Sequence, residues 1–178
     1  MRILVGHASA HGLTAEIARR IAEVLRGQGA SVDVERMGRI TDPGGYDAVV
    51  LGSAVHHQAW LPEATGFVRR HRGDLLARPV WLFSVGMSAG LPRLLRRPAH
   101  RAQDRRLAAA LRDVVRPRGH LLLSGVTGPD LLPGAAGLLF RGIGGHFGDH
   151  RDWAEIEAWA RRIARELSDD PAITSAGS

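Results

Sequence analysis

Residues 2–17 read RILVGHASAHGLTAEI, and this stretch decides the fold. The apolar run ILV at 3–5 predicts a buried strand, and a short loop of mostly small residues, 8–12, follows it. An amphipathic stretch that predicts a helix begins near Leu13. A strand, a tight loop and a helix start together aim backbone N–H groups and the positive end of a helix dipole at one point. The stretch therefore predicts an anion site, most naturally for a phosphate.

The loop differs from the two commonest nucleotide-binding motifs. It lacks G-x-G-x-x-G, and the chain contains no lysine, which excludes G-x-x-x-x-G-K-[ST]. It reads S-x-x-G-x-T, in which Gly12 lets the backbone come close to a bound group while Ser9 and Thr14 add hydroxyl donors. This pattern resembles the FMN-phosphate loop of the flavodoxin fold. The loop alone leaves open the alternative of an ordinary turn between a strand and a helix.

Length and composition favour one soluble domain. A chain of 178 residues can bury roughly 70% of its unfolded surface without metals or disulfides. We expect residues 1–168 to form the domain and 169–178 to form a frayed polar tail. The absence of cysteine excludes disulfides, thiolate nucleophiles, Fe–S clusters and cysteine-based zinc sites. The chain enters a strand without a signal pattern, and no apolar run reaches the ~18 residues of a spanning helix, so we expect a cytoplasmic protein.

The positive charge is concentrated in one segment. The net charge is +6, and residues 93–118 hold nine arginines against Asp104 and Asp113, a net charge of +7 for that segment. The rest of the chain therefore carries −1. The field of this segment favours acidic partners. Because no recognition motif and no interleaved aromatic residues accompany the arginines, we expect no nucleic-acid partner.

Apolar periodicity predicts five strands that alternate with helices. The first strand begins at residue 2, and the others are predicted at 31–35, 46–54, 80–85 and 119–126, with helices that start near Leu13, Pro62, His100 and Asp152. This alternation specifies a parallel α/β sheet with right-handed crossovers. We predict a single flavodoxin-like, doubly wound domain with strand order 2-1-3-4-5 and helices on both faces. Ligands in that order bind beyond the carboxyl ends of strands 1, 3 and 4.

Three loops follow the strands that this topology names: 8–14, 53–61 and 84–90. A flat aromatic cofactor needs backbone donors at its polar edge and an apolar or aromatic wall against its face. The second and third loops can supply both, with Trp60 or the ring of His56 as the candidate wall. The alternative for Trp60 is a core anchor at the start of the next helix.

Longer segments resemble one family. The chain reads YDAVVLGSAV at 46–55, WLPEA at 60–64, FVRRH at 67–71 and RPVWLFSVG at 78–86. Together with Gly144-Gly145, Asp149 and a closing helix that contains Trp153, Ile156 and Trp159, these segments resemble the flavodoxin-domain family that includes menaquinone-dependent protoporphyrinogen oxidase. The resemblance runs from Ile3 to about Leu167. It implies FMN as the cofactor, with the phosphate in the first loop and the ring against the second and third.

From the loops and the resemblance we predict one cofactor site and assign no metal ligand and no catalytic side chain. Its residues are Ser9, Ala10, His11, Gly12, Leu13, Thr14, Ser53, Ala54, Val55, His56, Trp60, Ser84, Val85 and Gly86. Two residues depart from the family's pattern: His56, where relatives often carry an aromatic residue, and Gln58, where they often carry glycine. The Gln58 side chain could crowd the ring.

Histidines gather at the predicted site. His7, His11, His56 and His57 should converge there, with His11 pairing with the phosphate and His56 or His57 near the ring. A metal site is the alternative, but neighbouring residues in an extended loop point to opposite sides. Solvated or locally bonded rings are the simplest interpretation for most of them.

The connection before the last helix, 127–148, is longer than the ~2–6 residues typical of its kind. In the oxidases that the chain resembles, a long insert at this position is associated with contact to the membrane or the quinone pool. Together with residues 93–118 it suggests a surface for anionic headgroups, and hence a peripheral location at the inner face of the membrane. The alternative is an insert that packs on its own domain.

Three functions stay open. The first is an FMN-dependent oxidoreductase whose flavin accepts a hydride equivalent from a reduced substrate, with porphyrinogen and quinone implied by the resemblance alone. Arginines such as Arg93, Arg96 and Arg97 could hold substrate carboxylates. The second is a flavodoxin-type electron carrier, against which the basic charge counts. The third is a flavodoxin-like module that has lost FMN. The oligomeric state is not predicted.

Overall fold

The computed structural model describes residues 1–56, 59–86, 114–124, 126–127, 148–149 and 152–171. In these ranges the chain forms β1 (Arg2–Ala8), α1 (Leu13–Gly27), β2 (Ser31–Arg36), the short 3-10 helices η1 (Met37–Arg39) and η2 (Pro43–Gly45), β3 (Ala48–His56), β4 (Ala59–Trp60), α2 (Pro62–Arg70), α3 (Arg72–Leu76), β5 (Val80–Gly86), β6 (Gly119–Ser124), β7 (Val126–Thr127), β8 (Gly148–Asp149) and α6 (Trp153–Ser168). Within these ranges no helix is long and apolar enough to cross a membrane.

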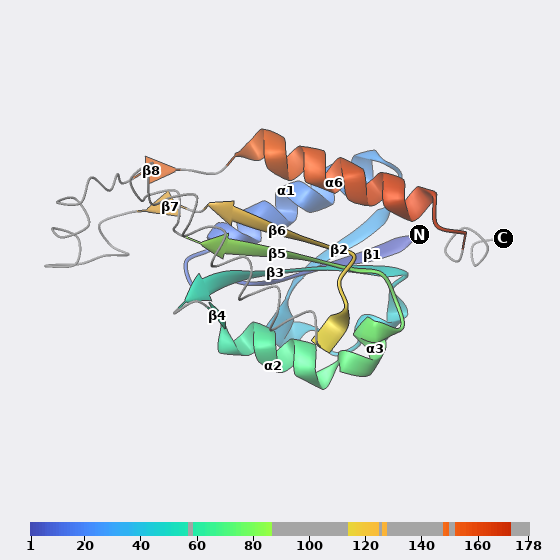
Figure 1. Ribbon diagram of the computed structural model, residues 1–178, viewed down its shortest axis with the longest axis horizontal. Helices are drawn as coiled ribbons and strands as arrows, with labels where there is room; N and C mark the ends of the chain where they lie inside the picture. The colour runs from blue at the N-terminus through green and yellow to red at the C-terminus, as the bar shows by residue number, and fades with distance from the viewer. Residues whose placement is uncertain (57–58, 87–113, 125, 128–147, 150–151, 172–178) are drawn as a thin grey trace, which may run out of the picture.

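Five parallel strands form the central sheet, in the order β2-β1-β3-β5-β6 (Figure 1). This is the predicted order 2-1-3-4-5, because β4 takes a number without joining the parallel path. β4 was not predicted: it pairs antiparallel with the end of β3, so that Val55 lies opposite Trp60 in a hairpin. β5 is buried along its whole length, as expected of a central parallel strand, whereas β2 has exposed residues along its length, as expected of an edge.

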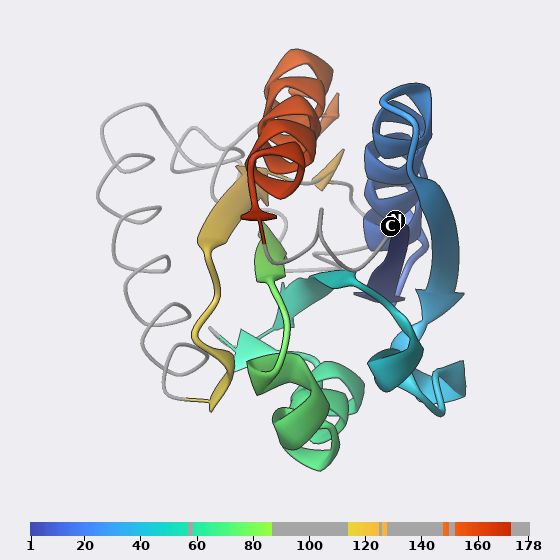
Figure 2. The same ribbon diagram turned by 90° about the vertical axis from the view of Figure 1, so that its right-hand side faces the viewer.

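The helices lie on both faces of the sheet, as predicted. α1 and α6 cover one face, and α2 and α3 cover the other (Figures 1 and 2). On the first face Ile17 and Ile21 of α1 and Ile163 of α6 share a buried core with the strands. On the second face Phe67 of α2 shares a buried core with Leu82 of β5. Burying a large apolar side chain contributes about 1.5–3 kcal/mol, so these two cores are what hold the three layers together.

One glycine is required by packing. Gly52 in β3 lies beside Phe83 in β5, and a Cβ at Gly52 would stand 1.9 Å from the Phe83 ring. The ring occupies that space and meets Trp159 of α6 edge to face, with 6.3 Å between ring centroids. A side chain at position 52 would therefore push the aromatic core of the α1–α6 face apart.

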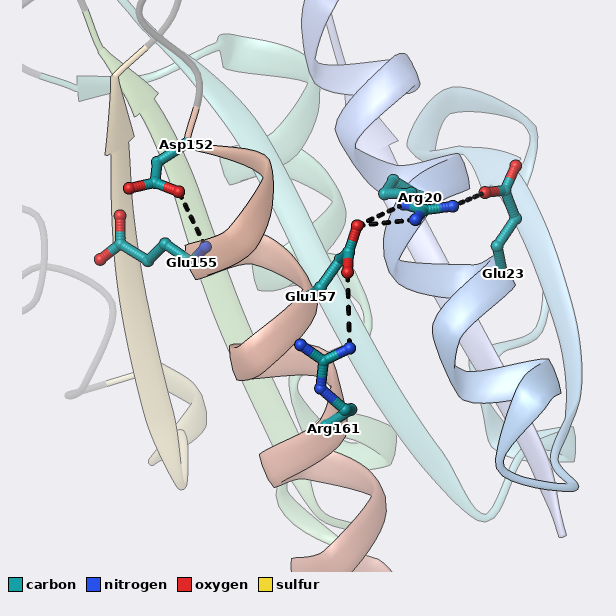
Figure 3. A network of polar contacts seen from close by, with 6 residues as sticks. All are labelled: Arg20, Glu23, Asp152, Glu155, Glu157 and Arg161. Carbon is teal, nitrogen blue, oxygen red and sulfur yellow. Dashed lines mark hydrogen bonds and ion pairs between the residues drawn. The ribbon is translucent and has the colours of Figure 1, made fainter.

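A polar seam joins α1 to α6 across the surface of the molecule (Figure 3). Arg20 donates from Nε and Nη2 to Glu157 Oε1 at 3.1 and 2.6 Å, and from Nη1 to Glu23 Oε2 at 2.8 Å. Arg161 adds a longer bond to Glu157, 3.4 Å. A surface hollow of about 440 Å³ lies along this seam and is lined by Glu16, Arg19, Arg20, Glu23, Trp153 and Glu157. Its lining is mostly charged, and within it Arg20 pairs with Glu23 and Glu157.

The residues at the ends of three helices are of the types expected at those positions. Asp152 caps α6, because its Oδ1 accepts a hydrogen bond from the Glu155 N–H at 3.0 Å (Figure 3). Pro62 opens α2 at a position where the missing N–H has no intrahelical role. Gly29, with a φ of +88°, follows the end of α1 in the left-handed conformation that glycine adopts without strain.

Some predicted segments fall outside the described residues. The helix expected from His100 is described only at Val114 and Val115, and the insert 127–148 only at its two ends. Those ends pair with each other in β7 and β8, where Thr127 lies opposite Gly148. The tail is described as far as Pro171, and Asp170 forms an ion pair with Arg118 at 2.5 Å, so this part is tied to the domain.

Candidate functional site

The carboxyl ends of the central strands lie side by side. Ala8, Ser53 and Ser84 occupy one register row across β1, β3 and β5. The three predicted loops therefore leave the sheet at the same edge, which is the left-hand end of the strands in Figure 1. The three strands therefore end side by side at the position where doubly wound folds bind their ligands.

The first loop has the geometry expected of an anion cradle. Gly12 has a φ of +83° and stands immediately before α1, and no atom lies within 4 Å of the position that a Cβ would take. The Thr14 N–H donates to Ser9 Oγ at 3.3 Å, and the Glu16 N–H donates to the Gly12 carbonyl at 3.1 Å. The exposed residues Ala10 and His11 complete the loop. Open space at the helix start leaves room for a bound group to approach the backbone.

Thr14 supplies the sharpest signal in the loop. The residue is 0% exposed, yet its Oγ1 has no hydrogen-bond partner among the described residues. Burying a hydroxyl without a partner costs about 1–3 kcal/mol, so such groups are rare and call for an explanation. A phosphate oxygen at the start of α1 would accept this hydrogen bond. The loop therefore offers an unsatisfied hydrogen-bond donor that fits an anion such as a phosphate.

The second loop is a hairpin held by two buried serines. Ser53 Oγ accepts from the Leu61 N–H at 3.1 Å and donates to the Ala54 carbonyl at 2.8 Å. Ser84 Oγ accepts from Trp60 Nε1 at 2.7 Å. Both serines are 0% exposed. Sequence reasoning placed these serines in the site, but it did not foresee that their hydroxyls bind the hairpin.

Trp60 is 4% exposed and packs in the core beside Ala64 and Phe67. This position is the one that the core-anchor alternative describes, whereas His56 is exposed at the end of β3. Ala54 and Val55, between Ser53 and His56 in β3, are half-buried. Val85 and Gly86 are buried at the end of β5. His57, Gln58 and the loop 87–90 lie outside the described residues.

His7 lies at the same edge of the sheet, one residue before the row of Ala8. It is half-buried, and its Nδ1 has no hydrogen-bond partner within the described part of the chain. Burial lowers its pKa below the usual 6.5, and the neighbouring charge of Arg19 lowers it further. His7 is therefore neutral near pH 7. Within the described ranges no cluster of three acidic or histidine side chains could hold a metal ion.

A carboxylate that the sequence did not single out braces this edge. Glu63, in the first turn of α2, receives two hydrogen bonds from Arg36, at 2.9 and 3.0 Å, and one from the Gly38 N–H at 3.0 Å. The Arg36 guanidinium holds the pKa of Glu63 below its usual value. The contact joins the end of β2 to α2, and its two residues are 27 positions apart in the sequence. A local sequence pattern therefore could not predict it.

A family model described as a flavodoxin domain matches residues 4–116. Among curated proteins, protoporphyrinogen IX dehydrogenase [quinone] of Escherichia coli strain K12 is 31% identical over 94 residues, which are 52% of this chain and 52% of that protein. The chain thus spans about half the length of the curated relatives that it matches.

Solved structures share the fold. The rubredoxin oxygen:oxidoreductase of Desulfovibrio gigas matches 94% of this chain and 36% of its own length, with a TM-score of 0.61 and 16% identity. A point mutant of the flavodoxin from Pseudomonas aeruginosa matches 94% of this chain and 99% of its own length, with a TM-score of 0.58 and 14% identity. A short-chain flavodoxin associated with a bacterial microcompartment gives a TM-score of 0.58 at 11% identity, with 93% of this chain and 98% of that chain matched.

Proposed function

The chain belongs to the flavodoxin-domain family, and from this premise we propose that it binds FMN and acts as a flavin-dependent oxidoreductase. The observation that carries the proposal is the buried Thr14 hydroxyl, which lacks a partner among the described residues and stands at the start of α1, beside a glycine loop with open space. An FMN phosphate satisfies the hydroxyl, the loop N–H groups and the helix dipole together.

In this proposal, different residues at the carboxyl edge bind the phosphate and the ring of FMN. Residues 9–14 bind the phosphate, with His11 as an exposed partner for its charge. Residues 54–56 and the end of β5 offer backbone groups to the ring. When bound, FMN supplies the capacity to accept a hydride equivalent from a reduced substrate. No side-chain nucleophile is required of the protein.

A porphyrinogen-type substrate and a quinone acceptor form the finer proposal. Its support is the 31% identity to protoporphyrinogen IX dehydrogenase [quinone] over half of the chain. Arginines of the segment 93–118 would hold the carboxylates of such a substrate. Replacing Arg93, Arg96 and Arg97 with glutamine should raise KM for a porphyrinogen that carries carboxylates; unchanged turnover and KM would remove these arginines from the proposal.

A location at the membrane surface is part of the same proposal. A net charge of +7 in residues 93–118 suits anionic headgroups, and the insert 127–148 is rich in leucine. We expect the protein to sediment with vesicles that contain an anionic lipid and to remain in solution with vesicles of neutral lipid. Equal binding to both, or to neither, would contradict this location.

A flavodoxin-type electron carrier is the second candidate. Its support is the flavodoxin-domain match over residues 4–116, since that match does not by itself separate a carrier from an enzyme. A carrier exchanges electrons with partner proteins and has no organic substrate. The carrier would be favoured over the enzyme by two results together: reduced organic substrates do not change the rate of flavin reduction, and a reductase reduces the flavin rapidly.

The first test is a visible spectrum of the purified protein before and after FMN is added and free flavin is removed on a desalting column. We expect flavin bands that stay with the protein at a stoichiometry near one. A conservative variant, Thr14→Ser, should keep the hydroxyl and the flavin. A colourless protein that takes up no FMN would overturn the proposal and leave a flavodoxin-like module without its cofactor.

A further inference from the structure

Three side chains form a buried hydrogen-bonded chain under the second loop. Trp60 of the hairpin donates from Nε1 to Ser84 Oγ at 2.7 Å, and Ser84 Oγ lies 2.9 Å from Nε2 of His120. The residues come from β4, β5 and β6 and are 24 and 36 positions apart. Trp60 and Ser84 are 4% and 0% exposed, and His120 is half-buried.

The direction of one hydrogen bond in this trio is fixed by chemistry. An indole N–H can only donate, so Trp60 Nε1 donates to a lone pair of Ser84 Oγ. The hydroxyl keeps a second lone pair and its own proton, so Ser84 Oγ either donates to Nε2 of His120 or accepts from it, according to the tautomer of His120. In both cases the Ser84 hydroxyl joins the hairpin to the sheet.

The positions of Ser53 and Ser84 indicate the role of the hydrogen bonds among Trp60, Ser84 and His120. Ser53 and Ser84 are register neighbours, both fully buried in an otherwise apolar layer, and both bind the same hairpin. A pair of valines would fill this layer without polar groups. Buried polar networks contribute specificity of placement more than net stability. Two adjacent hydroxyls that bind one hairpin therefore indicate that the hairpin must be held in a defined position.

The hairpin is the part of the edge that carries the candidate wall for the flavin ring. Val55 lies opposite Trp60 and His56 lies opposite Ala59, so a shift of Trp60 moves the end of β3 with it. We propose that the chain Trp60–Ser84–His120 fixes the hairpin and thereby sets the position of residues 54–56 toward the ring. These three are positioning residues, and their link to the ring rests on the proposed function.

The first experiment uses the protein without flavin and needs no cofactor. The Leu61 N–H, which binds Ser53 Oγ, reports on the hairpin through its amide hydrogen-exchange rate, resolved by NMR. Trp60→Phe and Ser84→Ala each remove a link of the chain and should speed this exchange by roughly 3- to 10-fold. Unchanged exchange in both variants would overturn the proposal.

Trp159→Phe is the matched control. Trp159 is 3% exposed in α6, and its Nε1 has no partner among the described residues, so this substitution changes the ring volume as Trp60→Phe does without removing a described hydrogen bond. It should leave the exchange of the Leu61 N–H unchanged. Faster exchange in Trp159→Phe as well would assign the effect to general loosening of the core and would also overturn the proposal.

The second experiment loads FMN and measures its visible circular dichroism and midpoint potential. Ser84→Ala and His120→Gln should change both, while Trp159→Phe should change neither. Faster exchange without any change in the flavin signals would overturn the link between hairpin and ring. If the unsubstituted protein takes up no FMN, the proposed function has failed, and the exchange rates still decide whether the chain holds the hairpin.

Discussion

Polar groups are bonded differently at the two ends of the parallel strands, called here the amino edge and the carboxyl edge of the central sheet. At the amino edge the groups are paired. The Arg2 N–H donates to Asp47 at 2.6 Å, and the indole of the buried Trp81 donates to Glu166 at 3.0 Å. Arg118 lies 5.7 Å from the centroid of the same indole ring and binds Asp170. This edge uses its charges to fasten the ends of the chain to the sheet.

At the carboxyl edge two buried atoms have no partner in the described part of the chain, Thr14 Oγ1 and His7 Nδ1. The surrounding hydroxyls of Ser53 and Ser84 are satisfied, so the edge as a whole is not poorly bonded. Among the described residues, the polar groups named at the amino edge are paired within the protein, whereas the carboxyl edge holds two buried polar atoms without a partner. Under the proposed function, the first group contributes to stability and the second is available to a ligand. Four substitutions or conditions test this contrast.

The largest effect is expected from Thr14→Val, which removes the unpartnered hydroxyl and keeps the shape of the side chain. FMN affinity should fall about 10- to 100-fold, because a hydrogen bond to a charged group contributes about 1.5–3 kcal/mol. Stability without flavin should be equal or higher, since a buried hydroxyl without a partner is removed. Titration calorimetry and urea unfolding measure the two quantities. A loss of stability with unchanged affinity would reverse the assignment of this edge.

The counterpart at the amino edge is Glu166→Ala. It leaves the Trp81 N–H buried without its acceptor, which should lower the free energy of unfolding by about 1–2 kcal/mol. FMN affinity should not change. Glu166→Gln keeps an acceptor oxygen and is the control in urea unfolding. If Glu166→Ala weakened FMN binding, the two edges could not be separated as described.

A smaller effect concerns His7 and pH. Because its pKa in the folded protein lies below 6.5, the unfolded chain takes up the proton first as the pH falls. His7 therefore contributes stability in full above about pH 6.5, and this contribution is lost as the pH drops from 6.5 toward the folded pKa. The slope is limited to about 1.4 kcal/mol per pH unit for one proton. In His7→Gln this part of the pH dependence of unfolding should disappear.

The smallest effect is expected from the exposed pair of Arg2 and Asp33 at the amino edge, 3.2 Å apart with side chains 59% and 52% exposed. Asp33→Asn should lower stability by no more than about 0.5 kcal/mol at low salt. In high salt the difference should vanish, because exposed charges are screened. Thermal unfolding at two ionic strengths measures it, and a loss that persists in high salt would show that more than the ion pair was removed.

Local sequence patterns were sufficient for the five parallel strands of the sheet and for the position of the first loop. The spacing of the apolar runs predicted the strand order, although not the short strand β4. The anion site expected from Ser9, Gly12 and Thr14 stays a prediction, and the loop has the left-handed glycine and the unpaired Thr14 hydroxyl that suit it. Both are local features, because a strand, a turn and a helix start are each specified within a few residues.

Contacts between distant positions could not be predicted in this way. Trp60, Ser84 and His120 meet only because three strands are in register, and Glu63 meets Arg36 only because α2 lies beside the end of β2. Periodicity identifies which face of a strand is buried, but not which polar atom on the next strand lies at the same height. For this reason Trp60 could be interpreted as a ring wall or as a core anchor from sequence alone.

The pairing of β7 with β8 has a consequence for protein engineering. Val126 and Thr127 lie opposite Asp149 and Gly148, so the segment between them leaves and re-enters the domain at neighbouring points of one antiparallel ladder. Antiparallel strands can be joined by a two-residue turn such as Asn-Gly. We therefore expect that such a turn in place of residues 128–147 preserves the pairing of β7 with β8, and that the same junction can accept a foreign sequence.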